Sequence, residues 1–80
     1  MLEQLKTAAK VVGAKQVRRA VQDGRAVRVF LAEDAASQIT QPLRMLCEEH
    51  AVPVEEVLSM KELGQACGIA VGAAVAALVA

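Results

Sequence analysis

The sequence predicts an α/β fold in which helices pack on one small sheet. Helical and strand-like hydrophobic patterns alternate along the 80 residues, and neither an internal repeat nor a linker separates them. Hydrophobic residues make up 55% of the chain, which excludes disorder by composition. A chain of this length is expected to form one small domain over residues 1–80, with little room for a deep cleft.

Two helical patterns open the chain. Residues 14–23 predict a helix that follows an interruption at Gly13 and precedes a C-terminal cap at Gly24. Before it, a first short helix is expected within residues 1–12, because apolar side chains recur there every three or four residues at Leu2, Leu5, Ala9 and Val12.

A strand and a third helix follow. Residues 26–32 are rich in β-branched side chains and predict a strand, and residues 33–37 a turn. The third helix runs to about His50, but its start stays open by about three residues because Pro42 belongs in a first turn. Its expected inner face comprises Ile39, Leu43, Leu46 and Cys47.

The last third repeats the alternation. Residues 52–58 predict a short strand near a sheet edge, because Pro53 lacks the N–H that a central strand needs. Ser59 and Glu62 have the spacing of a capping box, which predicts a fourth helix ending near Gly68. A loop over residues 68–72 and a final strand over residues 73–79 complete the expected fold.

The run from Leu63 to Ala80 contains no charged residue. A membrane helix becomes conceivable at about 18 residues, so a tail-anchored membrane or oligomerisation protein is the alternative hypothesis. However, three glycines and many alanines dilute the run, and these residues insert weakly. A fully covered strand also reads as a continuous apolar run. We therefore expect a strand inside the sheet and no membrane segment.

The charges are segregated although they cancel overall. Residues 1–28 hold seven basic and two acidic side chains, and residues 29–80 hold two basic and seven acidic ones. A neutral protein with one basic half can present a strong local field to an anion; complementary faces in a dimer would explain the same pattern. Phe30 is the only aromatic residue, which argues against a nucleic-acid module built on aromatic stacking.

Catalytic patterns are weak. Adjacent acids occur at residues 33–34, 48–49 and 55–56, but neighbours in a helix or strand point to different sides. Cys47 lies three residues before His50, so a small Cys–His hydrolase is a third hypothesis, although the apolar stripe around Cys47 favours a core thiol. One His and two distant Cys make a poor zinc site. We expect no enzyme, no metal and no cofactor, and a cytoplasmic protein with reduced thiols.

The second predicted helix carries the clearest binding pattern. Lys15, Arg18, Arg19 and Gln22 fall on one face at 100° per residue, opposite an apolar stripe. Gly13 permits a tight turn into the helix, whose N-terminus offers unpaired N–H groups to a phosphate. Lysine and arginine also donate to guanine edges. The alternative is an ordinary solvated basic helix.

Four segments together resemble a known family. V-V-G-A-K-Q-V-R-R-A-V-Q-D-G at residues 11–24 resembles the entry into helix two of the kink-turn RNA-binding family of ribosomal proteins L7Ae and L30e and their short bacterial homologues. Three further segments match in the same order: L-A-E-D-A at 31–35, L-C-E-E-H-A-V-P-V at 46–54, and S-M-K-E-L-G-Q-A-C-G-I-A-V-G-A-A-V-A at 59–76. The resemblance covers nearly the whole chain.

The resemblance implies a three-layer α-β-α sandwich around a small mixed sheet of about four strands. It also implies binding to a kink-turn, an RNA duplex bent at a bulge beside tandem sheared G·A pairs. In the family, helix two reads these guanines and an apolar loop covers the extruded bulge base. The matching positions, with Arg18 added from the helical wheel, are Gly13, Ala14, Lys15, Gln16, Arg18, Arg19, Lys61, Ile69, Ala70 and Val71.

Two positions depart from the family pattern. Many members have Thr-Asn-Glu after the glycine, where this chain has Ala14-Lys15-Gln16, and many have an acid at the position of Ala36. A cation in place of an amide predicts binding that depends more on salt. The resemblance implies a monomer in the cytoplasm that is ribosome-associated or stabilises structured RNA. Ribosomal, riboswitch and ribonuclease-type RNAs all stay open as targets.

Overall fold

Helices and strands alternate along the chain, as the sequence predicts. The computed structural model describes Leu5 and residues 8–80. Within them the elements are, in order, β1 (Lys10–Val12), α2 (Ala14–Gln22), β2 (Ala26–Ala32), α3 (Ser37–Glu49), β3 (Val54–Val57), α4 (Met60–Cys67) and β4 (Val75–Val79).

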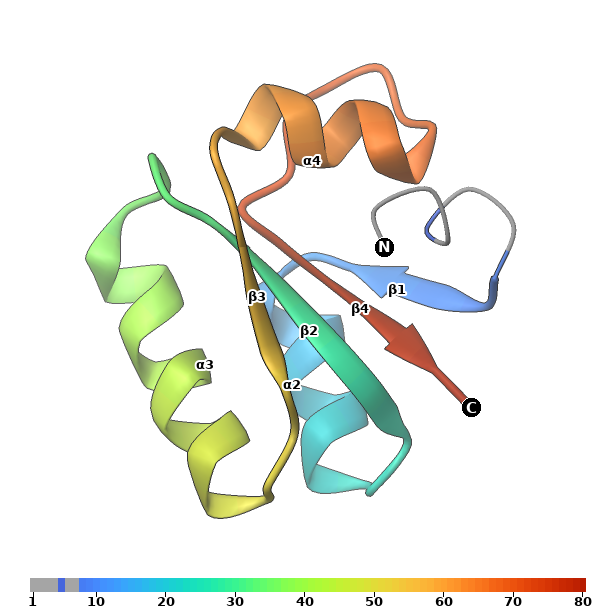
Figure 1. Cartoon of the computed structure of the whole chain (residues 1–80), viewed down its shortest axis with the longest axis vertical. Coiled ribbons are helices and arrows are strands. Elements are labelled where there is room, and N and C mark those ends of the chain that lie inside the picture. Colours follow the sequence, from blue (N-terminus) through green and yellow to red (C-terminus); the bar gives the residue numbers. More distant parts are fainter. Residues whose placement is uncertain (1–4, 6–7) are drawn as a thin grey trace.

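The four strands form one mixed sheet in the order β1-β4-β2-β3 (Figure 1). β4 is antiparallel to both of its neighbours, β1 and β2, whereas β2 and β3 run parallel. β3 therefore lies at an edge, as Pro53 predicts, and the carbonyl of Pro53 still accepts a hydrogen bond from the Val29 N–H (2.9 Å).

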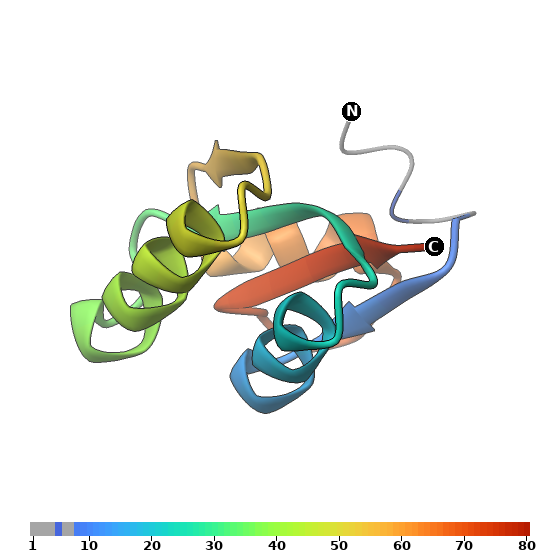
Figure 2. The same cartoon turned by 90° about the horizontal axis from the view of Figure 1, so that it is seen from below.

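Strand alternation divides the core into two clusters, one on each face of the sheet. On one face, α2 and α3 pack against β2 and β4 through Val17, Val21, Val29, Leu31, Leu43, Cys47, Val75 and Ala77. On the other face, α4 packs against the sheet in a cluster that comprises Leu5, Phe30, Ala32, Val57, Leu63, Cys67, Ala73, Ala76 and Leu78. Figure 2 shows α2 on the lower side of β2 and β4. The three-layer α-β-α arrangement is thereby confirmed.

Of the expected first helix, Leu5 is helical, as predicted, but residues 10–12 are not. Lys10–Val12 is a strand, paired from Lys10↔Leu78 to Val12↔Ala76, and Ala9 accepts a hydrogen bond from the Val79 N–H (3.0 Å). Leu2 lies outside the described residues, and Leu5 is fully buried. Without β1, the apolar strand β4 would leave the backbone groups of one edge unpaired. Pairing with β4 therefore decides the conformation of residues 10–12, although their apolar spacing is that of a helix.

The third helix also differs from the prediction in two details. It begins at Ser37 and contains Pro42 in its interior, so the proline does not mark the first turn. Leu43 and Cys47 are buried and Leu46 is half-buried, as expected for an inner face, but Ile39 is 39% exposed. The inner face of α3 instead includes the buried Thr40.

The uncharged C-terminal run divides into the end of α4, a loop and the central strand β4. The strand interpretation is confirmed and the tail-anchor alternative is wrong, since β4 pairs on both sides within the sheet. Among the described residues, no helix has the length and apolar character needed to cross a membrane.

The helix caps match the prediction. The Glu62 N–H donates to Ser59 Oγ (3.1 Å) at the start of α4, and Gly68 and Gly24, after α4 and α2, have φ of 78° and 75°.

Candidate nucleic-acid interface

The outer face of α2 gathers the polar residues that the helical wheel places there. Val17, Ala20 and Val21 are fully buried against the sheet. The side chains that the wheel places opposite them, Lys15, Arg18, Arg19 and Gln22, are all exposed, and so is Gln16. The buried stripe fixes the rotation of the helix and so holds the cations in solvent.

Gly13 sets the entry into α2. Its φ of 101° lies in the region that only glycine adopts without strain, and a Cβ there would meet no other atom within 4 Å. The backbone conformation, and not a lack of space, therefore requires glycine. The Gly13 N–H donates to the Val75 carbonyl (3.1 Å), which anchors the start of α2 to the start of β4. Ala14 follows as the first helical residue and is half-buried.

The cations of α2 are free of the ion pairs seen elsewhere in the described residues. Arg25 pairs with Asp23 (3.8 Å), Arg28 pairs with Glu55 (3.7 Å), and Arg44 pairs with Glu56. The hydrogen bond that the Arg44 guanidinium donates to the Glu56 carboxylate raises the pKa of Arg44 above its ordinary value. Lys15, Arg18 and Arg19 take part in none of these pairs, so their field is available to an anion.

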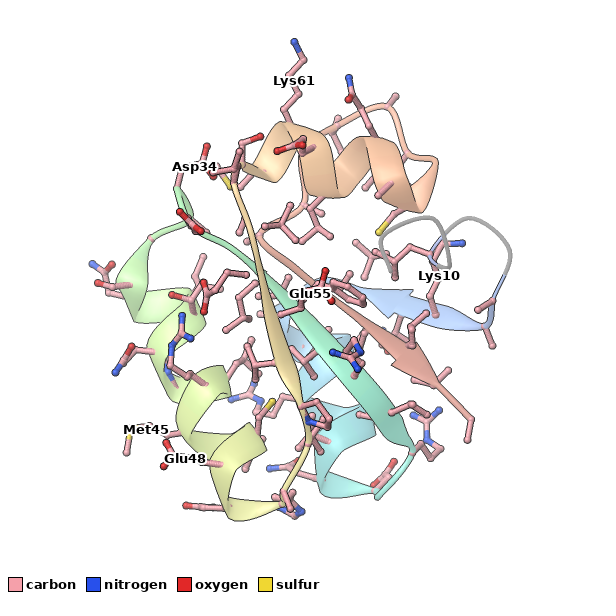
Figure 3. All side chains as sticks on the ribbon, in the orientation of Figure 1. Lys10, Asp34, Met45, Glu48, Glu55 and Lys61 are labelled. Atoms are coloured by element: carbon pink, nitrogen blue, oxygen red, sulfur yellow. The ribbon has the colours of Figure 1, made fainter. Side chains whose placement is uncertain are left out.

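The loop between α4 and β4 exposes apolar side chains. Ile69 is 37% exposed, Val71 is 71% exposed, and Ala70 is exposed as well. Beside the loop lies an open hollow of about 380 Å³, lined by Asp34, Met60, Lys61, Gln65, Ile69, Ala70, Val71 and Gly72. Figure 3 shows Lys61 projecting from α4 away from the sheet, with Asp34 near the start of that helix.

The fold brings the predicted site residues to one end of the sheet. The loop leads directly into β4, whose first residue, Val75, contacts Gly13 at the start of α2. Val75 also pairs with Leu31 at the end of β2, so Asp34 follows at the same end. The start of α2 and the loop thus lie at the same end of the sheet, although more than 50 residues separate them in sequence.

Several polar residues at this end were not predicted from the sequence. Asp34 and Gln65 line the hollow beside the loop, and Asp34 Oδ1 accepts a hydrogen bond from the Met60 N–H (2.8 Å). A smaller hollow of about 200 Å³ lies between α2 and α3, with Arg18 and Ile39 in its lining. The signal for Asp34 was its place between a strand and a helix, where polar side chains bond nearby backbone groups.

The structure argues against the Cys–His hydrolase hypothesis. Cys47 is fully buried, and burial raises the pKa of its thiol although Arg44 opposes the shift. His50 is exposed at the C-terminal cap of α3. A reactive thiol needs a lowered pKa and access to substrate, and Cys47 has neither. In the described part of the chain, no three His, Cys, Asp or Glu side chains gather as metal ligands.

Comparison with known proteins decides the family. The sequence profile of the Ribosomal protein L7Ae/L30e/S12e/Gadd45 family matches residues 2–80. The chain belongs to this family. It is 48% identical over 69 residues to an RNA-binding protein of Geobacillus sp. (strain WCH70), which covers 86% of this chain and 84% of that protein. It is 43% identical over 68 residues to RNA-binding protein TTE2299 of Caldanaerobacter subterraneus subsp. tengcongensis, covering 85% and 83%.

A solved structure agrees with the L7Ae-family fold. The 15.5 kDa RNA-binding protein of Giardia lamblia superimposes with a TM-score of 0.90 at 30% sequence identity. The match covers 99% of this chain and 70% of the Giardia chain. The whole of the small sheet and its helices therefore has a counterpart in a protein that is named for RNA binding.

Proposed function

We propose that this protein binds structured RNA at a kink-turn, through the outer face of α2 and the loop over residues 69–72. The observation that carries the proposal is the placement, at the same end of the sheet, of an exposed apolar loop and a row of cations that form no ion pair with the residues the structure describes. Family membership and the names of the relatives support RNA as the ligand. The proposed binding unit spans residues 1–80.

In this proposal α2 supplies affinity and part of the base recognition. Gly13 and Ala14 allow the RNA to approach the start of the helix, where the backbone N–H groups precede the first helical hydrogen bond, from Val17 to Gly13 (3.0 Å). Lys15 and Arg19 donate to guanine edges of the sheared pairs or to phosphates. Gln16 and Arg18, also exposed, add an amide and a further cation.

The loop supplies selectivity, because cations alone bind any duplex. Ile69, Ala70 and Val71 would cover the extruded base, whose apolar face is otherwise left in water. Their exposure supports this role over simple packing ahead of β4, since core residues would be buried. Lys61 lies across the hollow from the loop and would reach a phosphate or the base edge. Ala36, which precedes α3, offers no polar side-chain group for this contact.

The proposed physiological form is a cytoplasmic monomer that stabilises one bent RNA, either in the ribosome or in another structured RNA. Neither role requires a cofactor. Glu55 and Glu56 on β3 pair with arginines of β2 and α3, so their charges are partly satisfied within the protein.

The deciding experiment measures binding to two RNA duplexes that differ in one feature. The first has a bulge followed by tandem G·A pairs; in the second, Watson–Crick pairs replace the G·A pairs. We expect at least about tenfold tighter binding to the first in a gel-shift titration, with both affinities falling as salt rises. Equal affinity for the two RNAs would overturn kink-turn recognition and leave a non-selective basic helix.

A further inference from the structure

The loop over residues 69–72 is held with its backbone inward and its side chains outward. A Cβ built on Gly64, in the middle of α4, would lie 2.1 Å from the Val71 carbonyl oxygen and 3.0 Å from Gly72 Cα. A separation of 2.1 Å does not occur between a real Cβ and a carbonyl oxygen, so only glycine lets the loop approach the helix this closely. Val71 turns its carbonyl toward Gly64 while its side chain stays 71% exposed.

Backbone hydrogen bonds fasten both ends of the loop to α4. The Ile69 N–H donates to the Gly64 carbonyl (3.1 Å), and the Ala73 N–H donates to the Met60 carbonyl (3.0 Å). A Cβ on Gly72 would lie 3.2 Å from Met60 Cβ, which shows how closely this end of the loop follows the helix. The loop therefore takes its position from α4 and does not need to bury its own apolar side chains.

Asp34 connects this assembly to the rest of the fold. Its carboxylate accepts the N–H of Met60, the first residue of α4, at 2.8 Å. Met60 in turn holds the end of the loop through its carbonyl. A chain of contacts thus runs from the turn after β2, through the start of α4, to the exposed loop, and Figure 3 shows Asp34 at this junction.

We infer that Gly64 and Asp34 are positioning residues that preset the loop for selective binding to bent RNA. Preset geometry matters because a flexible loop would lose conformational freedom on binding and so lower the affinity. The inference rests on the proposed function for its RNA readout, but the position of the loop can be measured without RNA.

Gly64→Ala is the main test variant. Alanine favours a helix more than glycine does, so α4 itself should form, whereas the new Cβ must push the Val71 carbonyl away. We expect altered methyl NMR shifts of Ile69 and Val71 in the free protein. We also expect the ratio of kink-turn to plain-duplex affinity to fall at least about tenfold. Affinity for plain duplex should stay unchanged, because the cations of α2 are untouched.

Two substitutions of Asp34 separate the hydrogen bond from the charge. Asp34→Asn keeps an oxygen that accepts the Met60 N–H and should retain most of the selectivity, whereas Asp34→Ala should move the loop methyl shifts and lower the selectivity. Asp34 is exposed, so neither change empties a core position. Equal loss in both variants would overturn the positioning role of the hydrogen bond and assign the effect to charge.

Cys47→Ala is the control for a loss of stability, because it weakens the fold at a site away from the loop. Cys47 is buried in the cluster on the opposite face of the sheet and lies in α3, away from the loop. This variant should lower the thermal midpoint while leaving the loop shifts and the selectivity unchanged. Selectivity that falls equally in Cys47→Ala and Gly64→Ala would overturn the inference in favour of a general stability effect.

Different outcomes contradict RNA recognition and the positioning of the loop. If the unaltered protein does not distinguish the two RNAs, the proposed function is wrong, and the methyl shifts still show whether Gly64 and Asp34 hold the loop. If Gly64→Ala leaves both the shifts and the selectivity unchanged, the positioning inference is wrong and the proposed function stands. Displaced shifts with full selectivity would likewise overturn the link between loop position and selectivity.

Discussion

The outer face of α2 and the loop over residues 69–72 lie at the same end of the sheet, but different interactions fix their positions. On α2, helical periodicity and one buried stripe orient all five polar side chains at once. The loop lacks such periodicity, and its position depends on contacts with Gly64 and Met60 of a neighbouring helix.

The difference separates affinity from selectivity. A row of cations on a regular helix binds phosphate wherever the backbone passes, so small shifts in geometry cost little. An apolar loop contributes only where its side chains touch an unstacked base, so its placement decides its value. Substitutions in the two regions should accordingly produce two distinct patterns of binding loss.

The largest expected effect of a single side chain comes from α2. Arg19→Ala should weaken kink-turn binding by about 1–3 kcal/mol if Arg19 contacts a guanine edge. Calorimetric titration measures the loss, and the salt slope should become shallower because one fewer cation meets the RNA. Glu48→Gln is the matched control, since Glu48 is exposed on α3 outside the ion pairs of the described residues. Similar losses from both variants would count against a localised site.

A smaller and more selective loss is expected from the loop. The double substitution of Ile69 and Val71 to Ser should lower kink-turn affinity about tenfold while leaving plain-duplex affinity unchanged. Surface substitutions change the free energy of unfolding by about 0.5 kcal/mol or less, so the thermal midpoint should move little. A drop of several degrees would instead assign these residues to the core, where lost apolar groups cost about 1 kcal/mol or more each.

The smallest expected effect is a change in stability with pH, which comes from one buried thiol in each of the two core clusters. Burial raises the pKa of Cys47, on the inner face of α3, and of Cys67, at the end of α4, above the ordinary 9.0. The unfolded chain loses these protons first as pH rises, so the stabilising contribution is complete below pH 9.0 and is lost above it.

The measurement is the free energy of unfolding by urea, followed across pH 9.0. Cys47→Ala and Cys67→Ala should each show a shallower alkaline decline than the unaltered protein. If only one of the two variants makes this decline in the free energy of unfolding shallower, only the thiol in that cluster has a raised pKa. No change in slope for either variant would contradict the burial of both thiols.

Local patterns predicted most of the fold correctly. The strand over residues 26–32, the cap at Ser59 and the edge position of β3 all follow from short-range chemistry, and the structure confirms them. The predictions that were wrong concern segments whose conformation or orientation depends on residues far away in the sequence. Lys10–Val12 became a strand because β4 needed a neighbour, and Ile39 stayed exposed because α3 turns Thr40 toward the core.

For the candidate site, the sequence by itself determined which side chains α2 presents, because spacing along a helix dictates which residues share a face. It also determined that Gly13 and Gly68 stand where positive φ is required, at the ends of predicted helices. Only the tertiary structure decided that the loop lies at the same end of the sheet as the start of α2, and that Asp34 accepts a hydrogen bond from the first residue of α4. Those placements depend on the order and direction of strands in the sheet, which follow from the packing of the whole chain and not from any local pattern.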